Sequence, residues 1–257
     1  MNGLDIFSHS LRQVFGNFAV AVKISALLYL VQFGVTLWLG SMMPNFQLGA
    51  MDPNAMGDVP WGLVIVSYLV LLITGLWIAV AWHRYILLGE EPNSIVPTFR
   101  GDRMLAYFGY SILIALIMIP IAFILTFVVG LIAAPFLMSS SGPGYFSVIV
   151  VGLLVYVPMI VIVYRLSVVL PAAALEESLG IGGAWERTKG TTGAIIVLAI
   201  VSALGFIVIG LPVLFIFNPG SVPAIIWSFF TDWVAIMVGV SILTTLYGHY
   251  VEERPLV

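Results

Sequence analysis

Six long apolar runs dominate this sequence and decide what it can fold into. A helix that crosses the hydrocarbon core of a bilayer needs about 20 mostly apolar residues. The runs do not alternate apolar with polar residues, which excludes the strands of a membrane β-barrel. Because a helix satisfies its own backbone hydrogen bonds in hydrocarbon, the sequence predicts an all-α polytopic membrane protein with one transmembrane domain over residues 1–257. We expect the spans at residues 18–40, 62–83, 104–136, 146–170, 192–217 and 224–249.

Composition supports the same class of protein. Hydrophobic residues make up 61% of the chain and charged residues only 8%, whereas soluble domains carry roughly 25% charged residues. Cysteine is absent, so disulfides, thiolate nucleophiles and cysteine-ligated metals are excluded. The first residues have neither a basic start nor a small-residue cleavage site, so we expect the first run to remain as a span and not as a signal peptide.

Basic residues fall on one side of the predicted membrane. With six spans, all nine Lys and Arg lie at the termini and in the second and fourth connections. The first connection, on the opposite side, holds Asp52 and Asp58, and Asp232 lies near that side. The positive-inside rule therefore predicts that both termini are cytoplasmic. The basic residues are Arg12, Lys23, Arg84, Arg100, Arg103, Arg165, Arg187, Lys189 and Arg254.

The cytoplasmic ends of the three even-numbered spans have a similar layout. Each carries an aromatic residue, a basic residue or histidine, a short apolar stretch and then two glutamates, over residues 82–91, 164–177 and 247–253. The odd-numbered spans follow short basic segments, which we expect to form interfacial amphipathic helices. In the first segment an apolar stripe comprises Leu4, Phe7, Leu11 and Val14. The layout leaves open whether the chain is an internal repeat of three hairpins.

A resemblance to known proteins rests on two stretches, YRLSVVLPAAALEE at residues 164–177 and AWERTKG at residues 184–190. They resemble a group of bacterial six-span proteins that includes the membrane domain fused to some glycerophosphodiester phosphodiesterases and the YciC-like inner-membrane proteins. The group's pattern A-W-x-x-T-K-G matches Ala184, Trp185, Thr188, Lys189 and Gly190. The resemblance implies a six-span fold in the bacterial inner membrane. It implies no hydrolase activity, because six spans already occupy the chain.

The stretch AWHRYILLGEEP at residues 81–92 has two interpretations. In the favoured one, Trp82, His83 and Tyr85 anchor the helix at headgroup level. In the other, His83 and Glu90 form an acid–base or metal site. Seven residues of helix separate this pair by about 10 Å, which is too far for contact unless the chain bends at Gly89. The three histidines, His9, His83 and His249, lack metal-ligand spacing, so we expect no metal and no cofactor.

Arg84, Arg165 and Lys23 are the candidate contacts for lipid phosphate. Arg84 and Arg165 occupy matching places after the second and fourth spans, and Lys23 lies about one turn inside the first. One interpretation is that their side chains extend to the interface, as cations near helix ends commonly do. The other is a cytoplasmic pocket for an anionic lipid headgroup.

Asp232 is the candidate functional acid, and its role depends on where the sixth span begins. If the helix begins near Thr231, Asp232 is a first-turn residue that stabilises the helix N-terminus, which is the favoured interpretation. If the helix begins near Pro223, Asp232 lies about 14 Å deep. An acid at that depth is a functional residue by default.

Absent motifs narrow the function. The sequence contains no phosphate-binding P-loop, no GxSxG nucleophile elbow and no paired-aspartate signature of CDP-alcohol phosphotransferases. We therefore expect an inner-membrane protein without catalytic machinery, lipid-related or accessory to a membrane assembly. Its expected partners are anionic lipid headgroups and a membrane protein or second copy, and not nucleic acid. The alternatives are a permease for an apolar or amphipathic substrate and an intramembrane enzyme.

Overall fold

The computed structural model describes residues 2–42, 60–137, 145–218 and 220–256, and all regular structure within these ranges is helical. Six helices are long and apolar enough to cross a membrane, which confirms the prediction of an all-α polytopic protein. The expected turn at residues 139–144 and the acids Asp52 and Asp58 lie outside the described residues. The long helices are α2 (Phe18–Met42), α3 (Trp61–Leu88), α4 (Gly101–Leu137), α5 (Tyr145–Ser167), α8 (Thr192–Phe215) and α9 (Val222–Tyr250). The short helices are α1 (Gly3–Gly16), α6 (Val169–Leu175) and α7 (Ile181–Arg187).

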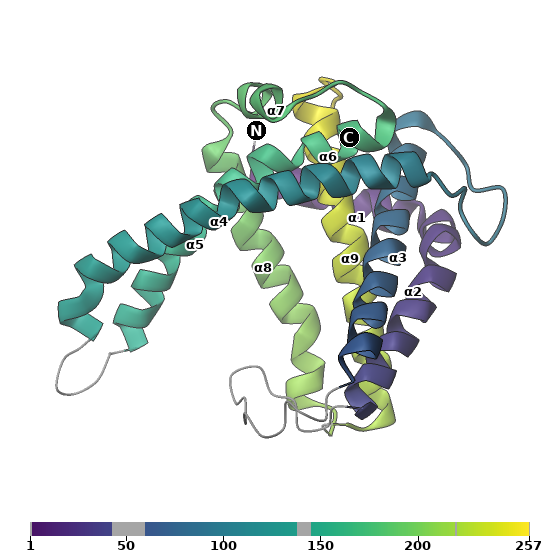
Figure 1. Ribbon diagram of the computed structural model, residues 1–257, viewed down its shortest axis with the longest axis horizontal. Helices are drawn as coiled ribbons and strands as arrows, with labels where there is room; N and C mark the ends of the chain where they lie inside the picture. Colours follow the sequence, from purple (N-terminus) through teal and green to yellow (C-terminus); the bar gives the residue numbers. More distant parts are fainter. Residues whose placement is uncertain (1, 43–59, 138–144, 219, 257) are drawn as a thin grey trace.

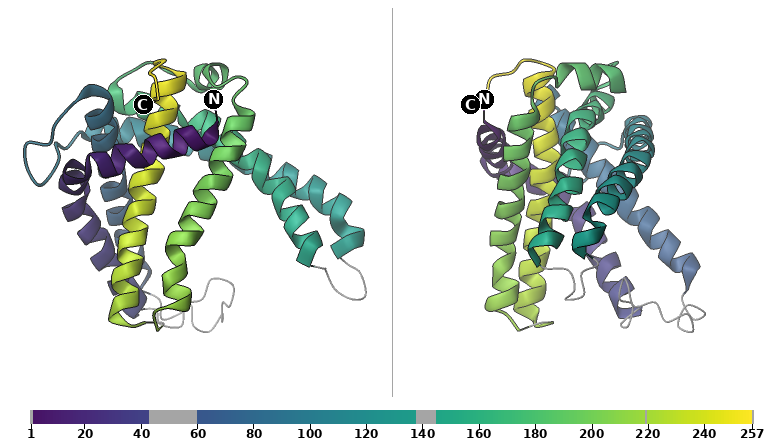
Figure 2. Two further views of the ribbon diagram at one scale, coloured as in Figure 1. Left: turned by 180° about the vertical axis from the view of Figure 1, so that it is seen from behind. Right: turned by 90° about the vertical axis from the view of Figure 1, so that its left-hand side faces the viewer.

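The long helices form a bundle and a leaning hairpin. Helix α2 packs against α3, and α9 packs against both α3 and α8. Helices α4 and α5 lie side by side and lean away from α8 at the end distant from the termini (Figures 1 and 2). Both termini lie at the same end of the molecule, as six spans require (Figure 1).

The densest packing lies in the half of the bundle that carries the termini. Trp82 of α3 and Met237, Ile242 and Leu246 of α9 are buried there. The leaning hairpin of α4 and α5 instead exposes large apolar side chains, such as Phe123 of α4, which is 73% exposed. An apolar surface of that kind is a liability in water, but hydrocarbon covers it when the helix spans a membrane.

Helix α1 departs from the expected interfacial helix. Its buried face comprises Gly3, Ile6, Phe7, Ser10 and Val14, and it lies across α8 and α9 (Figure 2, left). The predicted apolar stripe is therefore only partly right, because Leu4 is 50% exposed. The helix is part of the protein's own packing and covers the ends of two spans.

Most helix boundaries differ from the expected ones by a few residues, and two of these differences change the interpretation. Helix α3 continues five residues past the predicted end at residue 83 and stops at Gly89, whose φ of 69° suits glycine. Helix α4 begins at Gly101, so the basic segment before the third span is the first turn of that helix and not a separate one.

Candidate functional site

The tripeptide Trp82-His83-Arg84 lies in the protein core. Trp82 and His83 have no exposed surface, so the prediction that they anchor α3 among lipid headgroups is wrong. His83 Nδ1 is 2.8 Å from Thr244 Oγ1 of α9, and Nε2 is 3.5 Å from the hydroxyl of Tyr107 of α4. The imidazole therefore joins three helices and does not pair with Glu90, as an intramembrane acid–base site would require.

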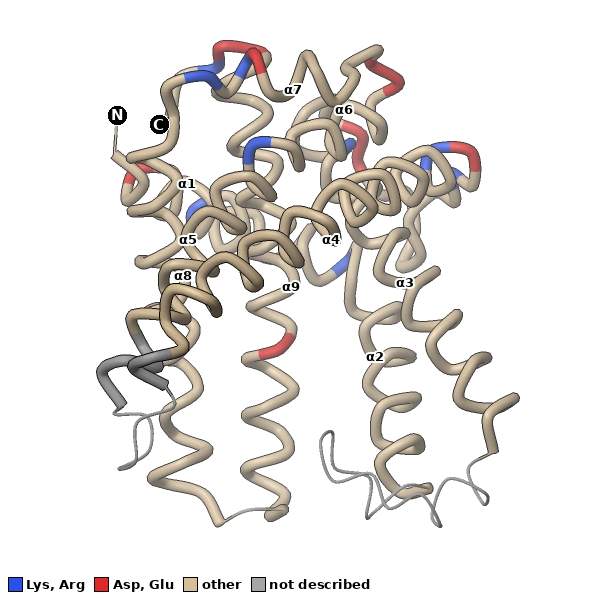
Figure 3. Tube along the Cα trace, turned by 60° about the vertical axis from the view of Figure 1, so that its left-hand side comes forward, with Lys and Arg blue, Asp and Glu red and all other residues tan. Residues whose placement is uncertain are grey.

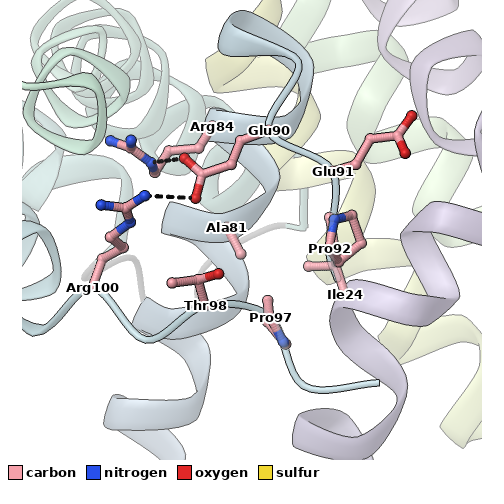
Figure 4. A pocket seen from close by; sticks show the side chains of 9 residues that line it. All are labelled: Ile24, Ala81, Arg84, Glu90, Glu91, Pro92, Pro97, Thr98 and Arg100. Carbon is pink, nitrogen blue, oxygen red and sulfur yellow. Dashed lines mark hydrogen bonds and ion pairs between the residues drawn. The ribbon is translucent and has the colours of Figure 1, made fainter. Parts of the chain in front are cut away.

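Glu90 holds two arginines at the end of α3. Arg84 Nε donates to Glu90 Oε2 at 2.7 Å, and Arg100 Nη2 donates to Oε1 at 2.9 Å (Figure 4). Burial by itself would raise the pKa of the Glu90 carboxyl, but hydrogen bonds from Arg100 and Arg84 outweigh it and leave the pKa below its ordinary value. The adjoining cavity is only about 20 Å³, enough for about one water molecule. The cluster is thus a structural ion-pair site.

Three arginines at this end of the molecule donate to helix C-termini. Arg84 Nη1 donates to the carbonyl of Ala174 in α6 at 2.9 Å, and Arg165 Nη2 donates to that of Trp185 in α7 at 2.7 Å. Arg254 Nη2 donates to the carbonyl of Leu87 in α3 at 2.8 Å. The last carbonyls of a helix lack donors within it and carry negative partial charge, so a cation is well placed there.

The lipid contacts predicted for Arg84, Arg165 and Lys23 stay predictions. Arg84 and Arg165 are both buried, and each has two guanidinium nitrogens bonded to protein. Lys23 is exposed on α2, and no described acid lies within ion-pair distance of it. Of the three candidates, Lys23 is therefore the cation best placed to reach a lipid phosphate.

The AWERTKG motif surrounds Arg165. The guanidinium carbon lies 3.5 Å from the centre of the Trp185 ring, and Nε donates to Thr188 Oγ1 at 3.2 Å. Gly190, at a φ of 80°, then turns the chain into α8. Three of the motif's residues thus have structural roles between α5 and α8. The sequence does not indicate that the motif packs on Arg165, which precedes Trp185 by 20 residues.

We expect Trp185→Leu to lower the free energy of unfolding by about 1 kcal/mol, because the cation–π contact with Arg165 is lost at a partly exposed site. Thermal melting of the purified protein in detergent measures the effect. Trp185→Phe keeps a ring under the guanidinium and should melt between the wild type and Trp185→Leu. Equal losses in both variants would contradict the stacking argument.

Asp232 is not a helix cap. Helix α9 begins at Val222, and the Ser221 hydroxyl accepts the N–H of Ala224 at 3.4 Å. Asp232 therefore follows ten residues of helix, a rise of about 15 Å. The favoured cap interpretation is wrong, because the helix begins near Pro223, as the other interpretation requires. Across the described ranges, no Lys, Arg or His lies within ion-pair distance of its carboxylate.

Asp232 borders an open groove of about 700 Å³ between α2 and α9, which we call the Asp232 groove. The lining residues of α2 and of α9 recur at helical spacing, so each of these two helices presents one face to the groove. The volume lies within the range of about 300–1,000 Å³ typical of ligand sites. Five lining residues are polar: Tyr29, Gln32, Thr36, Ser228 and Asp232. The others are Phe33, Leu37, Leu71, Val213, Gly220, Ala224, Ile225, Ala235 and Ile236.

Hydrogen bonds hold the helices around this groove. The Tyr29 hydroxyl donates to the carbonyl of Phe229 at 2.8 Å, and Trp233 Nε1 donates to Ser25 Oγ at 2.8 Å. These bonds fix α2 against α9. Sequence reasoning singled out Asp232 but not the groove, because the groove depends on which two spans pair.

A second cavity, of about 290 Å³, lies near the termini and is lined in part by His9, His249 and Arg254. His83 is not among the lining residues, although its ring bonds Thr244, which is one of them. Among the residues that the structure describes, no three His, Cys, Asp or Glu side chains are placed to hold a metal.

These features define a class: a polytopic helical membrane protein with a ligand-sized groove between its spans. No family model, curated protein or solved structure matches the chain. The resemblance to the bacterial six-span group therefore stays a prediction from the sequence.

Proposed function

We propose that this is a lipid-binding protein of the bacterial inner membrane, which holds an amphipathic molecule in the Asp232 groove and catalyses no reaction on it. The observation that carries the proposal is the groove itself: a ligand-sized space with apolar walls and a small set of polar side chains, bounded by helices of membrane-spanning length. Such a composition suits a molecule with a polar head and an apolar chain.

Charge distribution supports an orientation for this site. The Lys and Arg residues gather at the end that carries the termini (Figure 3), and the positive-inside rule makes that end cytoplasmic. The Asp232 groove is lined by the N-terminal half of α9 and the C-terminal half of α2, which lie toward the other end. The proposed ligand therefore comes from the outer leaflet of the inner membrane.

Polar contacts, and not apolar ones, must provide selectivity. Bulk lipid offers an acyl chain the same apolar surroundings as the groove walls, so apolar contact alone gives little preference. The polar residues at the groove, Asp232 above all, are what bulk hydrocarbon lacks.

We expect Ala235→Phe to reduce the lipid retained by the purified protein by about one molecule, because a phenyl ring at this lining position occupies the groove. Native mass spectrometry counts the bound lipid. Ile226→Phe is the control, since Ile226 is 62% exposed on α9 and outside the groove. The proposal fails if both variants retain the wild-type amount while remaining folded by circular dichroism.

A permease for an amphipathic substrate is the second candidate, and one observation favours it. Helix α9 borders the Asp232 groove at one end and the 290 Å³ cavity at the other. Between them Met237, Val238 and Ile242 are buried, so a passage requires the core to move. Transfer of a fluorescent lipid between the leaflets of proteoliposomes would favour this candidate, and transfer no faster than in empty liposomes would favour binding alone.

A further inference from the structure

We infer that the Asp232 groove selects amphiphiles whose head carries a primary ammonium, with Asp232 as its counter-ion. The inference rests on the proposed function and names the chemistry of the ligand. Two features support it: the charge at the groove and the hydrogen-bond acceptors that remain there.

Asp232 carries a carboxylate that no basic residue of the chain neutralises. An ionised carboxylate within a membrane span is costly unless a cation accompanies it. All nine Lys and Arg lie within the described residues, and none is within 4 Å of this carboxylate. Lys23, on the facing helix α2, precedes the first groove residue, Tyr29, by six residues, a rise of about 9 Å. The chain supplies no cation there, so an ionised Asp232 must take its counter-ion from the ligand.

Three of the four side chains that could donate a hydrogen bond into the groove, Tyr29, Gln32 and Thr36, already donate within the protein, and the fourth is Ser228. The Tyr29 hydroxyl donates to Phe229 O at 2.8 Å, and Gln32 Nε2 donates to Thr74 Oγ1 at 3.0 Å. Thr36 Oγ1 donates to the backbone carbonyl of Gln32 at 2.9 Å. These side chains therefore present mainly acceptors to the groove, namely the Gln32 amide oxygen and the hydroxyl lone pairs.

Acceptors beside a carboxylate distinguish between head groups. A head whose only charged group is a phosphate or carboxylate would meet negative charge and few donors, and a quaternary ammonium has no N–H to donate. A primary ammonium has three donors and one positive charge, which matches Asp232 together with Gln32 and Thr36. The ligand is either a phospholipid with an ethanolamine head or a free long-chain amine, since both carry this group.

Lipid competition tests the inference. Wild-type protein is equilibrated with equal amounts of phosphatidylethanolamine, phosphatidylcholine and phosphatidylglycerol, and retained lipids are counted by native mass spectrometry. We expect a preference of about tenfold for phosphatidylethanolamine, the ratio that one charged hydrogen bond provides. Asp232→Asn should reduce it to less than about twofold while the total lipid stays the same. Glu177→Gln, which removes an exposed acid after α6, should keep it.

A second arm distinguishes the two sources. Dodecylamine and dodecanol share a chain and differ in the ammonium, so each is added separately as a competitor. Preference for phosphatidylethanolamine without displacement by dodecylamine supports a phospholipid ligand, and displacement by dodecylamine but not dodecanol supports a free amine. The inference is overturned if phosphatidylethanolamine is not preferred over the other two phospholipids and dodecylamine competes no better than dodecanol. It is also overturned if Asp232→Asn keeps the preference.

The two proposals fail in different ways. If Ala235→Phe leaves the bound lipid unchanged, the groove is not a lipid site and the proposed function fails. If Ala235→Phe removes the lipid but the wild type shows no preference for amines, the proposed function stands and only the ammonium inference fails.

Discussion

Replacing Gly3 by alanine is expected to destabilise the protein by about 3 kcal/mol, the upper part of the usual range for overpacking. A Cβ atom at this position would lie 2.1 Å from the carbonyl oxygen of Ala194 and 2.3 Å from the backbone nitrogen of Leu198. Both neighbours are backbone atoms of α8, so no side-chain rotation relieves the overlap. Helix α1 would have to move away from α8, and Ile6 and Phe7, which are buried in this packing, would move with it.

Gly16→Ala is the matched control for this variant. Gly16 ends the same helix, and a Cβ atom there meets nothing within 4 Å. Alanine at that site should leave stability unchanged or raise it by up to about 1 kcal/mol, because glycine is the weaker helix former. Thermal melting in detergent compares the two variants. Similar melting temperatures for Gly3→Ala and Gly16→Ala would mean that α1 does not pack closely on α8.

The spans could be predicted because length and hydropathy decide them. The end of α3 could not, since the sequence places His83 and Arg84 where a helix commonly leaves a membrane. In the structure, α3 continues to Leu88, and Arg84 is paired inside the protein with Glu90. That pairing needs the left-handed turn at Gly89, which brings Glu90 back to Arg84. The sequence indicates that the chain can bend at this glycine, but not which side chains the bend brings together.

The start of α9 can be predicted from local sequence signals. Ser221 and Pro223 form a strong helix-start signal, a capping serine followed by a proline in the first turn. The aromatic residues around Asp232 favoured a later start instead. The Asp232 groove is a different case, because it requires α2 and α9 to face each other. No local pattern reports that tertiary pairing.

Replacing Glu90 by glutamine is expected to destabilise the protein by about 2 kcal/mol. The Arg84 side chain is 10% exposed, and its closest carboxylate is that of Glu90 at 2.7 Å. Removing one partner of a buried ion pair costs about 3–5 kcal/mol, and the 29% exposure of Glu90 reduces this value. Glu91→Gln is the control, because Glu91 is exposed and forms no ion pair with the rest of the described chain. Its melting temperature should equal that of the wild type.

Acid titration and a double variant identify the cause of this loss. The pKa of Glu90 is lowered in the folded protein, so its contribution is fully present above the ordinary glutamate pKa of 4.5 and is lost as the pH falls through the lowered value. The stability difference between wild type and Glu90→Gln should therefore be constant near neutral pH and shrink below about pH 4.5. Without the Glu90 carboxylate, Arg84 keeps only Glu176, at 3.5 Å, as an acidic partner. Arg84→Met in the Glu90→Gln background removes this incompletely paired guanidinium and should recover part of the loss. The recovery is partial because the methionine cannot donate to the carbonyl of Ala174, which Arg84 Nη1 bonds at 2.9 Å. A double variant less stable than Glu90→Gln alone would show that Arg84 acts mainly through α6 and not through its ion pair.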